Sequence, residues 1–208
     1  MARKRQEDKP DTAARILDVA ERLVQTRGFN GFSYADVASE LDVTKASLHY
    51  HFPGKAELGQ ALVARYASRF AGALEQIDRA TSSAPAKLGA YVRVYGDVLR
   101  DGRMCLCGML AAEYETLPGP MQEALTRFFD DGESWLTGVL EHGAAEGSVR
   151  LTGSARDTAR AIVSGLEGAM LTARPFGDTE RFDSAADRLL ATLTGAEPAT
   201  ARRARAGG

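Results

Sequence analysis

Residues 33–58 of the 208-residue chain read SYADVASELDVTKASLHYHFPGKAEL, and this stretch decides the fold. Ser33 can cap a helix whose apolar residues keep helical spacing as far as Leu41. After a short connection, Thr44 can cap a second helix, which must end before the proline and glycine at 53 and 54. Two short helices joined in this way have the dimensions of a helix-turn-helix.

A helix-turn-helix reads DNA because its second helix, held by the first, fits the major groove, which is ~12 Å wide. The residues that can form the apolar inner face are Val37, Leu41, Val43, Leu48 and Phe52. The residues left to face outward are Thr44, Lys45, Ala46, Ser47, His49, Tyr50 and His51. Imidazole and aromatic side chains on the outer face suit contacts with phosphates and base edges. Short helices with such a cluster also cap ordinary helical domains, so spacing alone leaves both interpretations open.

Apolar residues recur at helical spacing along almost the whole chain, and sustained strand-like alternation is missing. We therefore expect an all-α protein. A first helix fits from Asp11 or Thr12 to Gly28, where a helix commonly stops. The longest pattern, 55–79, predicts a rod of roughly 37 Å. Further helices are expected at 86–101, 104–115, 120–146, 155–174 and 181–194.

Composition excludes several classes of protein. The chain is 44% hydrophobic, which suits a folded protein. Its formal net charge is −2, so the overall charge does not by itself indicate a nucleic-acid-binding protein. Stretches free of charged residues are well short of the ~18 residues that a membrane-spanning helix needs. The basic N-terminus has no apolar core, so we expect no secretory signal. The sequence therefore predicts a cytoplasmic protein without a membrane partner.

The chain divides near residue 55 in charge and pattern. Residues 1–55 carry a net charge of +1, and the remainder carries −3. We interpret 1–55 as a helix-turn-helix DNA-binding domain, joined by the long helix to a helical body at 56–195 that has a separate role. The polar, basic segment 196–208 is predicted to be a disordered tail.

Several sub-motifs of this region occur in a fixed order: Gly28-Phe29, SYADVA at 33–38, and VTKASLHYHFPGKAEL at 43–58. Together they closely resemble the DNA-binding region of the TetR family of bacterial transcriptional regulators. Downstream, the resemblance is weaker but consistent in length and helical character. The resemblance implies an all-α subunit of about nine helices, a two-fold homodimer, and repression that a small ligand relieves, with 56–195 as the ligand-binding and dimerisation domain.

The resemblance also assigns residues that contact DNA. It places the recognition helix on residues 44–49. The residues that match base-facing positions are Lys45, Ala46, Ser47 and His49. Those that match phosphate-holding positions are Thr44, Tyr50, His51 and Lys55. His49 departs from the family, which very often has tyrosine there, so the base preference at this position stays open. The basic residues 3–5 fit a DNA-binding arm or a solvated tail equally well.

A dimer is expected because one short helix reads only a few base pairs. Two-fold symmetry demands a palindromic operator with half-sites ~34 Å apart, or a multiple of that distance. The interface candidates lie on the last two helical patterns: Ile162, Gly165, Leu166, Ala169, Leu189 and Leu193. In the family, the corresponding helices form a four-helix bundle with the partner. The same pattern fits a core within one chain.

An inducer pocket should be concave and largely apolar, with a few polar groups. The residues that can line it are Tyr91, Tyr95, Met104, Met109, Phe128, Trp135 and Met170, with Glu113 as a polar anchor. Each of them also fits an ordinary core. A small apolar inducer would have to favour one arrangement of the long helix 55–79 over another in order to release DNA.

The cysteines Cys105 and Cys107 suggest an alternative, a repressor that senses electrophiles or oxidants through one of these thiols. Some members of the family use a cysteine near this place. A reactive thiol needs an electropositive, partly exposed setting, which Arg103 can help to provide. Small helical cysteines also serve as plain packing residues.

An enzyme is not expected, because the chain has no P-loop, GxGxxG after a strand, GxSxG or HExxH motif. A helical enzyme or a ligand carrier remains the competing class. With three histidines and two cysteines, no metal site and no cofactor are predicted. The expected partners are double-stranded DNA, a second copy of the chain, and an unidentified small-molecule inducer.

Overall fold

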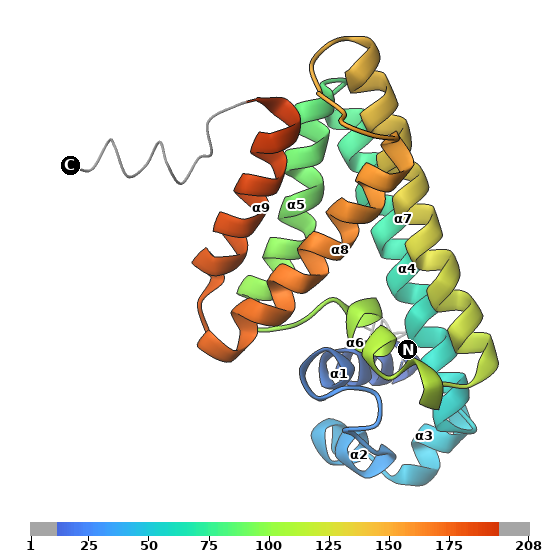
Figure 1. The fold of residues 1–208 in the computed structure, drawn as a ribbon. Coiled ribbons are helices and arrows are strands. Elements are labelled where there is room, and N and C mark those ends of the chain that lie inside the picture. The colour runs from blue at the N-terminus through green and yellow to red at the C-terminus, as the bar shows by residue number, and fades with distance from the viewer. Residues whose placement is uncertain (1–11, 196–208) are drawn as a thin grey trace, which may run out of the picture. The chain divides into compact units, whose positions relative to one another are not determined.

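The computed structural model describes residues 12–195, and all regular structure in this range is helical, as predicted. The expected DNA arm at 3–5, the Asp11 cap and the tail at 196–208 lie outside these residues. The helices, shown in Figure 1, are α1 (Thr12–Arg27), α2 (Tyr34–Leu41), α3 (Lys45–His51), α4 (Lys55–Ala80), α5 (Ala84–Arg100), α6 (Leu106–Ala112), η1 (Tyr114–Thr116), α7 (Gly119–Ala145), α8 (Ala155–Ala173), η2 (Arg174–Phe176) and α9 (Thr179–Thr194).

The helices form two compact units that do not follow chain order. One unit contains the described residues up to Tyr66 together with Leu106–Leu125, and the other contains Ala67–Cys105 and the described residues from Thr126 onward. Helices α4 and α7 contribute to both. The sequence places a boundary at residue 55, whereas packing joins α6 to the N-terminal helices because α6 contacts α1.

The first unit has its core between α1 and the helices that follow it. The buried apolar residues of α1 to α3 and of the part of α4 in this unit are Ile16, Ala20, Leu23, Val24, Val37, Ala38, Leu48, Leu58, Leu62 and Val63. Helices α4 and α7 approach closely at Gly59, where a Cβ would lie 2.4 Å from Met121 Sδ. A side chain at residue 59 would require the Met121 side chain and the Phe29 ring to move, so glycine makes room for both of them.

The helix predicted at 104–115 is shorter in the structure. Helix α6 covers Leu106–Ala112, and a separate 3₁₀ turn follows at Tyr114–Thr116. Glu113 between them has non-helical backbone angles, with φ −111° and ψ 17°. The prediction missed this break because it depends on where the Glu113 side chain binds, which is a tertiary contact.

The second unit is built on α5, α8 and α9, which pack against one another and lie side by side in Figure 1. Their buried side chains include Leu88, Leu166 and Phe182. The second half of α4 meets α7 through Phe70 and Phe128, whose ring centroids lie 5.0 Å apart. Aromatic side chains therefore dominate this part of the core.

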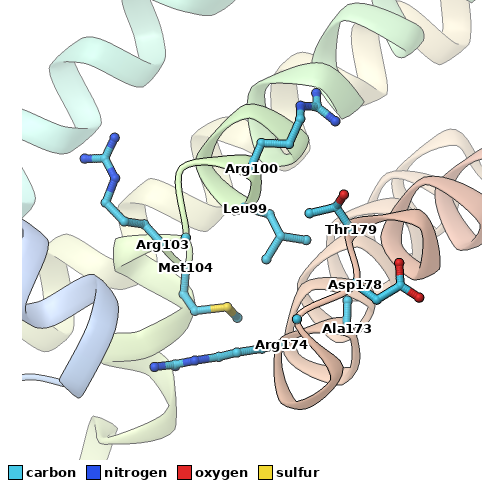
Figure 2. A pocket seen from close by; sticks show the side chains of 10 residues that line it. Leu99, Arg100, Arg103, Met104, Ala173, Arg174, Asp178 and Thr179 are labelled. Carbon is cyan, nitrogen blue, oxygen red and sulfur yellow. The ribbon is translucent and has the colours of Figure 1, made fainter.

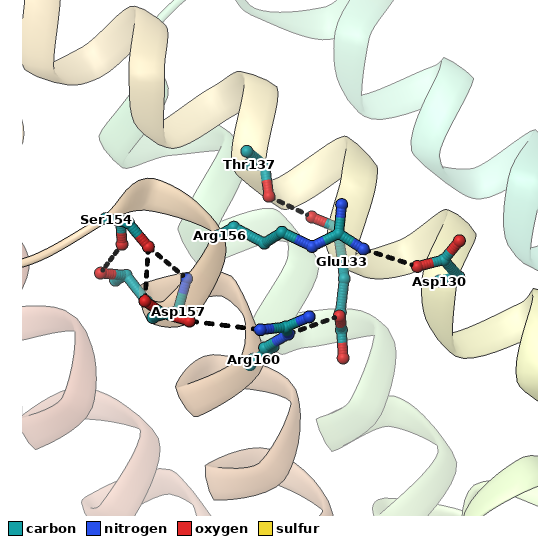
Figure 3. A network of polar contacts seen from close by, with 8 residues as sticks. Asp130, Glu133, Thr137, Ser154, Arg156, Asp157 and Arg160 are labelled. Carbon is teal, nitrogen blue, oxygen red and sulfur yellow. Dashed lines mark hydrogen bonds and ion pairs between the residues drawn. The ribbon is translucent and has the colours of Figure 1, made fainter.

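Charged pairs join α7 to the start of α8, as Figure 3 shows. Arg156 donates to Asp130 at 2.9 Å, and Arg160 bridges Glu133 and Asp157 at 3.4 and 3.3 Å. Ser154 caps α8 by accepting a hydrogen bond from the Asp157 amide at 3.0 Å. Most of these groups are exposed, so each ion pair adds little, while the cap contributes about 1 kcal/mol.

Helices α4 and α7 have 26 and 27 residues, long enough in length alone to cross a bilayer. Charged residues recur along both of them. Among residues 12–195, no helix combines the length and the apolarity that a membrane span requires.

Candidate nucleic-acid interface and sensor core

Local hydrogen bonds fix the helix pair α2–α3. The Ser33 amide donates to the Asp36 carboxylate at 2.7 Å and starts α2, as the sequence predicts. Asp42 then adopts a left-handed conformation with φ 54°, which turns the chain. The Thr44 hydroxyl accepts from the Ser47 amide at 3.2 Å and starts α3. The α3 helix is thus held at its beginning by its own sequence.

The two faces of α3 differ sharply. Leu48 is fully buried in the unit, whereas Lys45, Ala46 and His49 are exposed and Ser47 is half-buried. Tyr50 is 85% exposed, more than any other large apolar side chain among residues 12–195. Of the remaining candidates, Thr44 is exposed and His51 is half-buried against the Tyr50 ring, with centroids 5.1 Å apart. The predicted DNA-contacting residues of α3 are therefore exposed or half-buried, and Leu48 alone among the residues of this helix is buried.

His49 is exposed but held in place. Its Nδ1 lies 2.9 Å from the carbonyl oxygen of Pro53, and because a carbonyl only accepts, Nδ1 must carry the proton. Its ring also packs on Tyr34 at 4.8 Å. Burial, helped by the negative charge of Glu57, raises the pKa of Tyr34 to about 12, so its hydroxyl stays a donor. Because Pro53 engages Nδ1, the Nε2 atom of the neutral His49 ring is the nitrogen that can accept a hydrogen bond from a ligand.

Lys55 points inward. Its ammonium donates to the Phe32 carbonyl at 2.6 Å and lies 4.8 and 4.4 Å from the ring centroids of Phe29 and Phe32. Burial lowers the pKa of this ammonium, while Glu113 and Asp36 favour its charged form. The structure thus gives Lys55 a role in holding the N-terminal unit together, which the resemblance to the family does not indicate.

Glu113, the predicted polar anchor of the inducer pocket, lies in the N-terminal unit. Its carboxylate accepts from the backbone amides of Phe29 at 2.7 Å and Asn30 at 3.2 Å. Gly28, with φ +87°, leaves room for it, since a Cβ there would lie 2.5 Å from Glu113 Oε1. Met109 on α6 belongs to the same unit. The structure does not group these two residues with the other pocket candidates.

The aromatic pocket candidates do come together in the second unit. Tyr91 stacks on Trp135, with centroids 5.7 Å apart and planes at 15°, and lies 5.4 Å from Tyr95. Phe128 joins them through Phe70, which belongs to the apolar pattern of the long helix but is not among the predicted pocket residues. Met170 is fully buried on α8.

Glu167 on α8 is a second residue that sequence reasoning missed. It is a charged residue within the apolar face formed by Val163 and Met170. A charge at such a position is the sequence feature that could have identified Glu167. Burial raises the pKa of its carboxyl group, partly offset by a hydrogen bond with Cys105. Burial raises the pKa values of the Tyr91 and Tyr95 hydroxyls, and the charge of Glu167 adds a smaller contribution in the same direction.

A pocket of about 250 Å³ opens between the end of α5 and the turn from α8 to α9, and Figure 2 shows its lining. Leu99, Met104 and Ala173 supply apolar surface, and arginines 100, 103 and 174 surround it. Two of these arginines bind acidic neighbours: residue 100 pairs with Asp97 and Asp183, and residue 103 with Asp101. The pocket is therefore mixed in character rather than strongly cationic.

The predicted interface residues separate into two groups. Ile162, Leu166, Ala169 and Leu193 are buried within the chain, where they pack between α8 and its neighbours. Gly165 is exposed and Leu189 half-buried. Leu171, also on α8, is 60% exposed and was not singled out from the sequence. The apolar pattern thus predicted an apolar helix face correctly. It could not distinguish packing within the chain from packing against a second copy.

Both cysteines are buried: Cys105 is 2% exposed and Cys107 is fully buried. Arg103, the expected activating group, pairs with Asp101 at 2.6 Å. Reactive thiols typically lie in exposed, electropositive surroundings. The structure does not provide the exposure at these two positions.

Known proteins match both parts of the chain. Residues 16–62 match the bacterial regulatory proteins of the tetR family, and residues 84–189 match the tetracyclin repressor-like C-terminal domain. A TetR-family transcriptional regulator from Agrobacterium tumefaciens shares the fold with a TM-score of 0.84 and 34% identity, covering 88% of this chain and 97% of that one.

Two curated relatives are also regulators. The HTH-type transcriptional regulator TtgR of Pseudomonas putida is 40% identical over 63 residues, a match that spans 30% of each chain. The transcriptional regulator AcuR of Cereibacter sphaeroides is 28% identical over 152 residues, 71% of this chain and 69% of that protein. The family matches extend over both units, and the proteins matched are transcriptional regulators, not enzymes. The chain therefore belongs to the TetR family of DNA-binding transcriptional regulators.

Proposed function

We propose that this chain is a ligand-responsive repressor that binds a palindromic operator as a homodimer. One observation carries the DNA-binding mode: α3 buries Leu48 completely while it presents Lys45 and the 85% exposed Tyr50 on its outer side. The exposed Tyr50 hydroxyl is free to donate a hydrogen bond, and a phosphate oxygen is a suitable acceptor for it.

The proposed contacts divide by position on α3. Lys45, Ala46, Ser47 and His49 would face base edges, and Thr44, Tyr50 and His51 would hold phosphates. His49 would present Nε2 to the groove because Pro53 engages its Nδ1. An imidazole acceptor suits an exocyclic amine of cytosine or adenine, which tyrosine would read less strictly.

The proposed dimer uses the outer surface of α8 and α9. Gly165 and Gly168 are exposed there, and Leu171 adds an exposed apolar side chain. Small residues let a partner helix approach closely, which is the packing that a helical interface needs. Two copies of α3 would then read half-sites about one turn of DNA apart.

The proposed ligand response depends on α4, which contributes residues 55–66 to one unit and 67–80 to the other. A ligand that alters the packing around Phe70 would act on the same helix that carries Lys55. It changes DNA affinity only if it binds the two states of the protein unequally. As a regulator of bacterial genes, the protein would act in the cytoplasm.

A duplex-selection experiment followed by a salt titration tests the DNA-binding mode. The affinity for the selected duplex should fall steeply as salt rises, because phosphate contacts release counterions. Tyr50→Phe should weaken binding to all duplexes similarly, whereas Lys45→Ala should change which duplex is preferred. A ligand carrier or an enzyme would select no duplex and show little salt dependence, and that result would refute the proposal.

A further inference from the structure

The pocket of Figure 2 is a small cavity built entirely from residues of the second unit. Its lining comes from the end of α5, the segment that follows it, and the turn from α8 into α9. The volume of about 250 Å³ is just below the roughly 300–1,000 Å³ of pockets that hold drug-sized ligands. A Cβ at Gly102 or at Gly177 would meet no atom of residues 12–195 within 4 Å. The cavity therefore has room for a small molecule and is not blocked at these two turns.

One side of the cavity is apolar. Leu99, Met104 and Ala173 are buried in the core of the unit, and all three also line the cavity. Apolar surface of this kind favours contact with another apolar group over contact with water. A ligand that carries a short apolar chain would bury that chain against these three side chains.

Arginines form the polar side of the cavity. Arg100, Arg103 and Arg174 line it, and among the lining residues Asp178 alone carries a carboxylate. That carboxylate already caps α9 and pairs with Arg181 at 3.6 Å. A cation in the cavity would meet three guanidinium groups and an acid that has partners of its own. The lining therefore disfavours a positively charged ligand.

Aspartates around the cavity limit how much negative charge it can hold. Arg100 donates to Asp97 at 2.8 Å and to Asp183 at 3.4 Å. Arg103 pairs with Asp101 at 2.6 Å. These partly exposed pairs offset some of the positive charge, so a single negative charge suits the cavity better than a phosphate dianion. A guanidinium has more N–H donors than the two that Arg100 uses here, and its flat fork matches a carboxylate.

We propose that this pocket binds a small organic monocarboxylate with a short apolar chain. In Figure 2 the Arg174 side chain extends along the cavity below Met104. A carboxylate that accepts hydrogen bonds from the Arg174 guanidinium has its chain against Met104, Leu99 and Ala173. The arginines thus select the charge of the ligand, and the buried side chains select its apolar part.

The site deepens the proposed function, on which it rests in one respect, because it names the chemical class of the inducer. Leu99 lies one helical turn after Tyr95 on α5. The Tyr95 ring meets Phe70 of α4 edge-on, with centroids 6.3 Å apart. A ligand that displaces the end of α5 therefore acts on α4 through two packed rings. Binding itself does not require DNA and is measured separately.

Met104 makes the site directly observable. It is one of five methionines in the chain, and the one methionine among residues 12–195 that lines this cavity. The full chain is labelled with ¹³C in its methionine methyl groups and titrated with hexanoate, and Met104→Leu identifies the Met104 resonance. Hexanoate should shift this resonance in a saturable way and more than any other methionine resonance. No shift, or a larger shift at another methionine, would overturn the proposal.

The same titration with related probes separates charge from apolar contact. Hexan-1-ol and hexylammonium keep a similar chain and change the head group, whereas acetate keeps the carboxylate and lacks the chain. Hexanoate should bind most tightly, acetate and hexan-1-ol more weakly, and hexylammonium most weakly. Tighter binding of hexan-1-ol or hexylammonium than of hexanoate would show that the arginines do not select an anion. Equal binding of acetate and hexanoate would show that the apolar side plays no part.

The variant Arg174→Met removes the guanidinium and keeps an unbranched side chain at an exposed position. It should weaken hexanoate binding at least about tenfold and change hexan-1-ol binding little, because only the carboxylate gains from a charged donor. Arg79→Met makes the same change at an exposed position of α4 outside the lining and should leave both affinities unchanged. Equal hexanoate binding by wild type and Arg174→Met would refute the role of Arg174.

A DNA-binding measurement distinguishes this site from the proposed function. If hexanoate binds and also lowers affinity for the selected duplex, it occupies the inducer site. If hexanoate binds without any effect on DNA, the site stands but is not the inducer site, and the proposed deepening of function is wrong. If the chain binds no duplex, the proposed function fails, and the methionine resonances still decide the site by themselves.

Discussion

The carboxylate of Glu113 accepts a hydrogen bond from the backbone amide of Phe29 at 2.7 Å, across 84 positions of the chain. Thr116 reinforces the contact by accepting from the Asn30 side chain at 2.8 Å. The 3₁₀ turn that follows α6 is thereby fastened to the turn between α1 and α2. A segment remote in sequence thus supports the helices that present α3.

Removal of this carboxylate should loosen the N-terminal unit. Glu113→Ala should lower the free energy of unfolding by about 1–3 kcal/mol, because the Phe29 and Asn30 amides lose their acceptor. It should also weaken binding to every duplex. Urea unfolding and DNA titration measure the two effects. Glu115→Ala, an exposed change in the same turn, serves as the control, and equal effects of the two variants would contradict the prediction.

The cap of α2 should respond to acid. Hydrogen bonds from Ser33 lower the pKa of Asp36 below its ordinary value of 3.8. The unfolded chain therefore takes up this proton first, so the stabilisation by Asp36 is present above the ordinary value and is lost as pH falls through the lowered one. Urea unfolding of wild type and Asp36→Asn between about pH 6 and about pH 2 should show a difference that shrinks at the acid end. A pH-independent difference would show that the charge has no part in the cap.

Lys55 and Tyr50 should differ in their effects on stability. Lys55→Ala removes the bond to the Phe32 carbonyl and two ring contacts, and should cost about 1–3 kcal/mol of unfolding free energy. Tyr50→Phe alters an exposed hydroxyl and should change that energy by less than about 0.5 kcal/mol. Thermal unfolding compares the two. If Lys55→Ala were as stable as wild type but deficient in DNA binding, a phosphate contact would be its main role.

Dimerisation should depend on the exposed side of α8. Leu171→Arg, at a position that is 60% exposed, should leave the helical content unchanged and yield monomers in sedimentation velocity. Ile162→Ala changes a residue that is 1% exposed and should cost about 2–5 kcal/mol of unfolding free energy, because it leaves a cavity. A dimer that survived Leu171→Arg would place the interface elsewhere.

The sequence was sufficient where structure is local. The Ser33 cap, the stop at Gly28 and the Thr44 cap depend on residues a few positions apart, and the structure confirms all three. The longest predicted helix, 55–79, appears as Lys55–Ala80 for the same reason. Helical periodicity and capping are properties of contiguous residues, so they can be recognised before the chain folds.

Only the tertiary structure decided which partner each side chain meets. Glu113 and Phe29 are 84 positions apart, and Trp135 stacks on Tyr91 from another helix. An apolar pattern shows that Ile162 must leave water, but it does not show whether its neighbour belongs to the same chain. Burial and long-range hydrogen bonds depend on how helices pack, and packing is determined by the whole chain together.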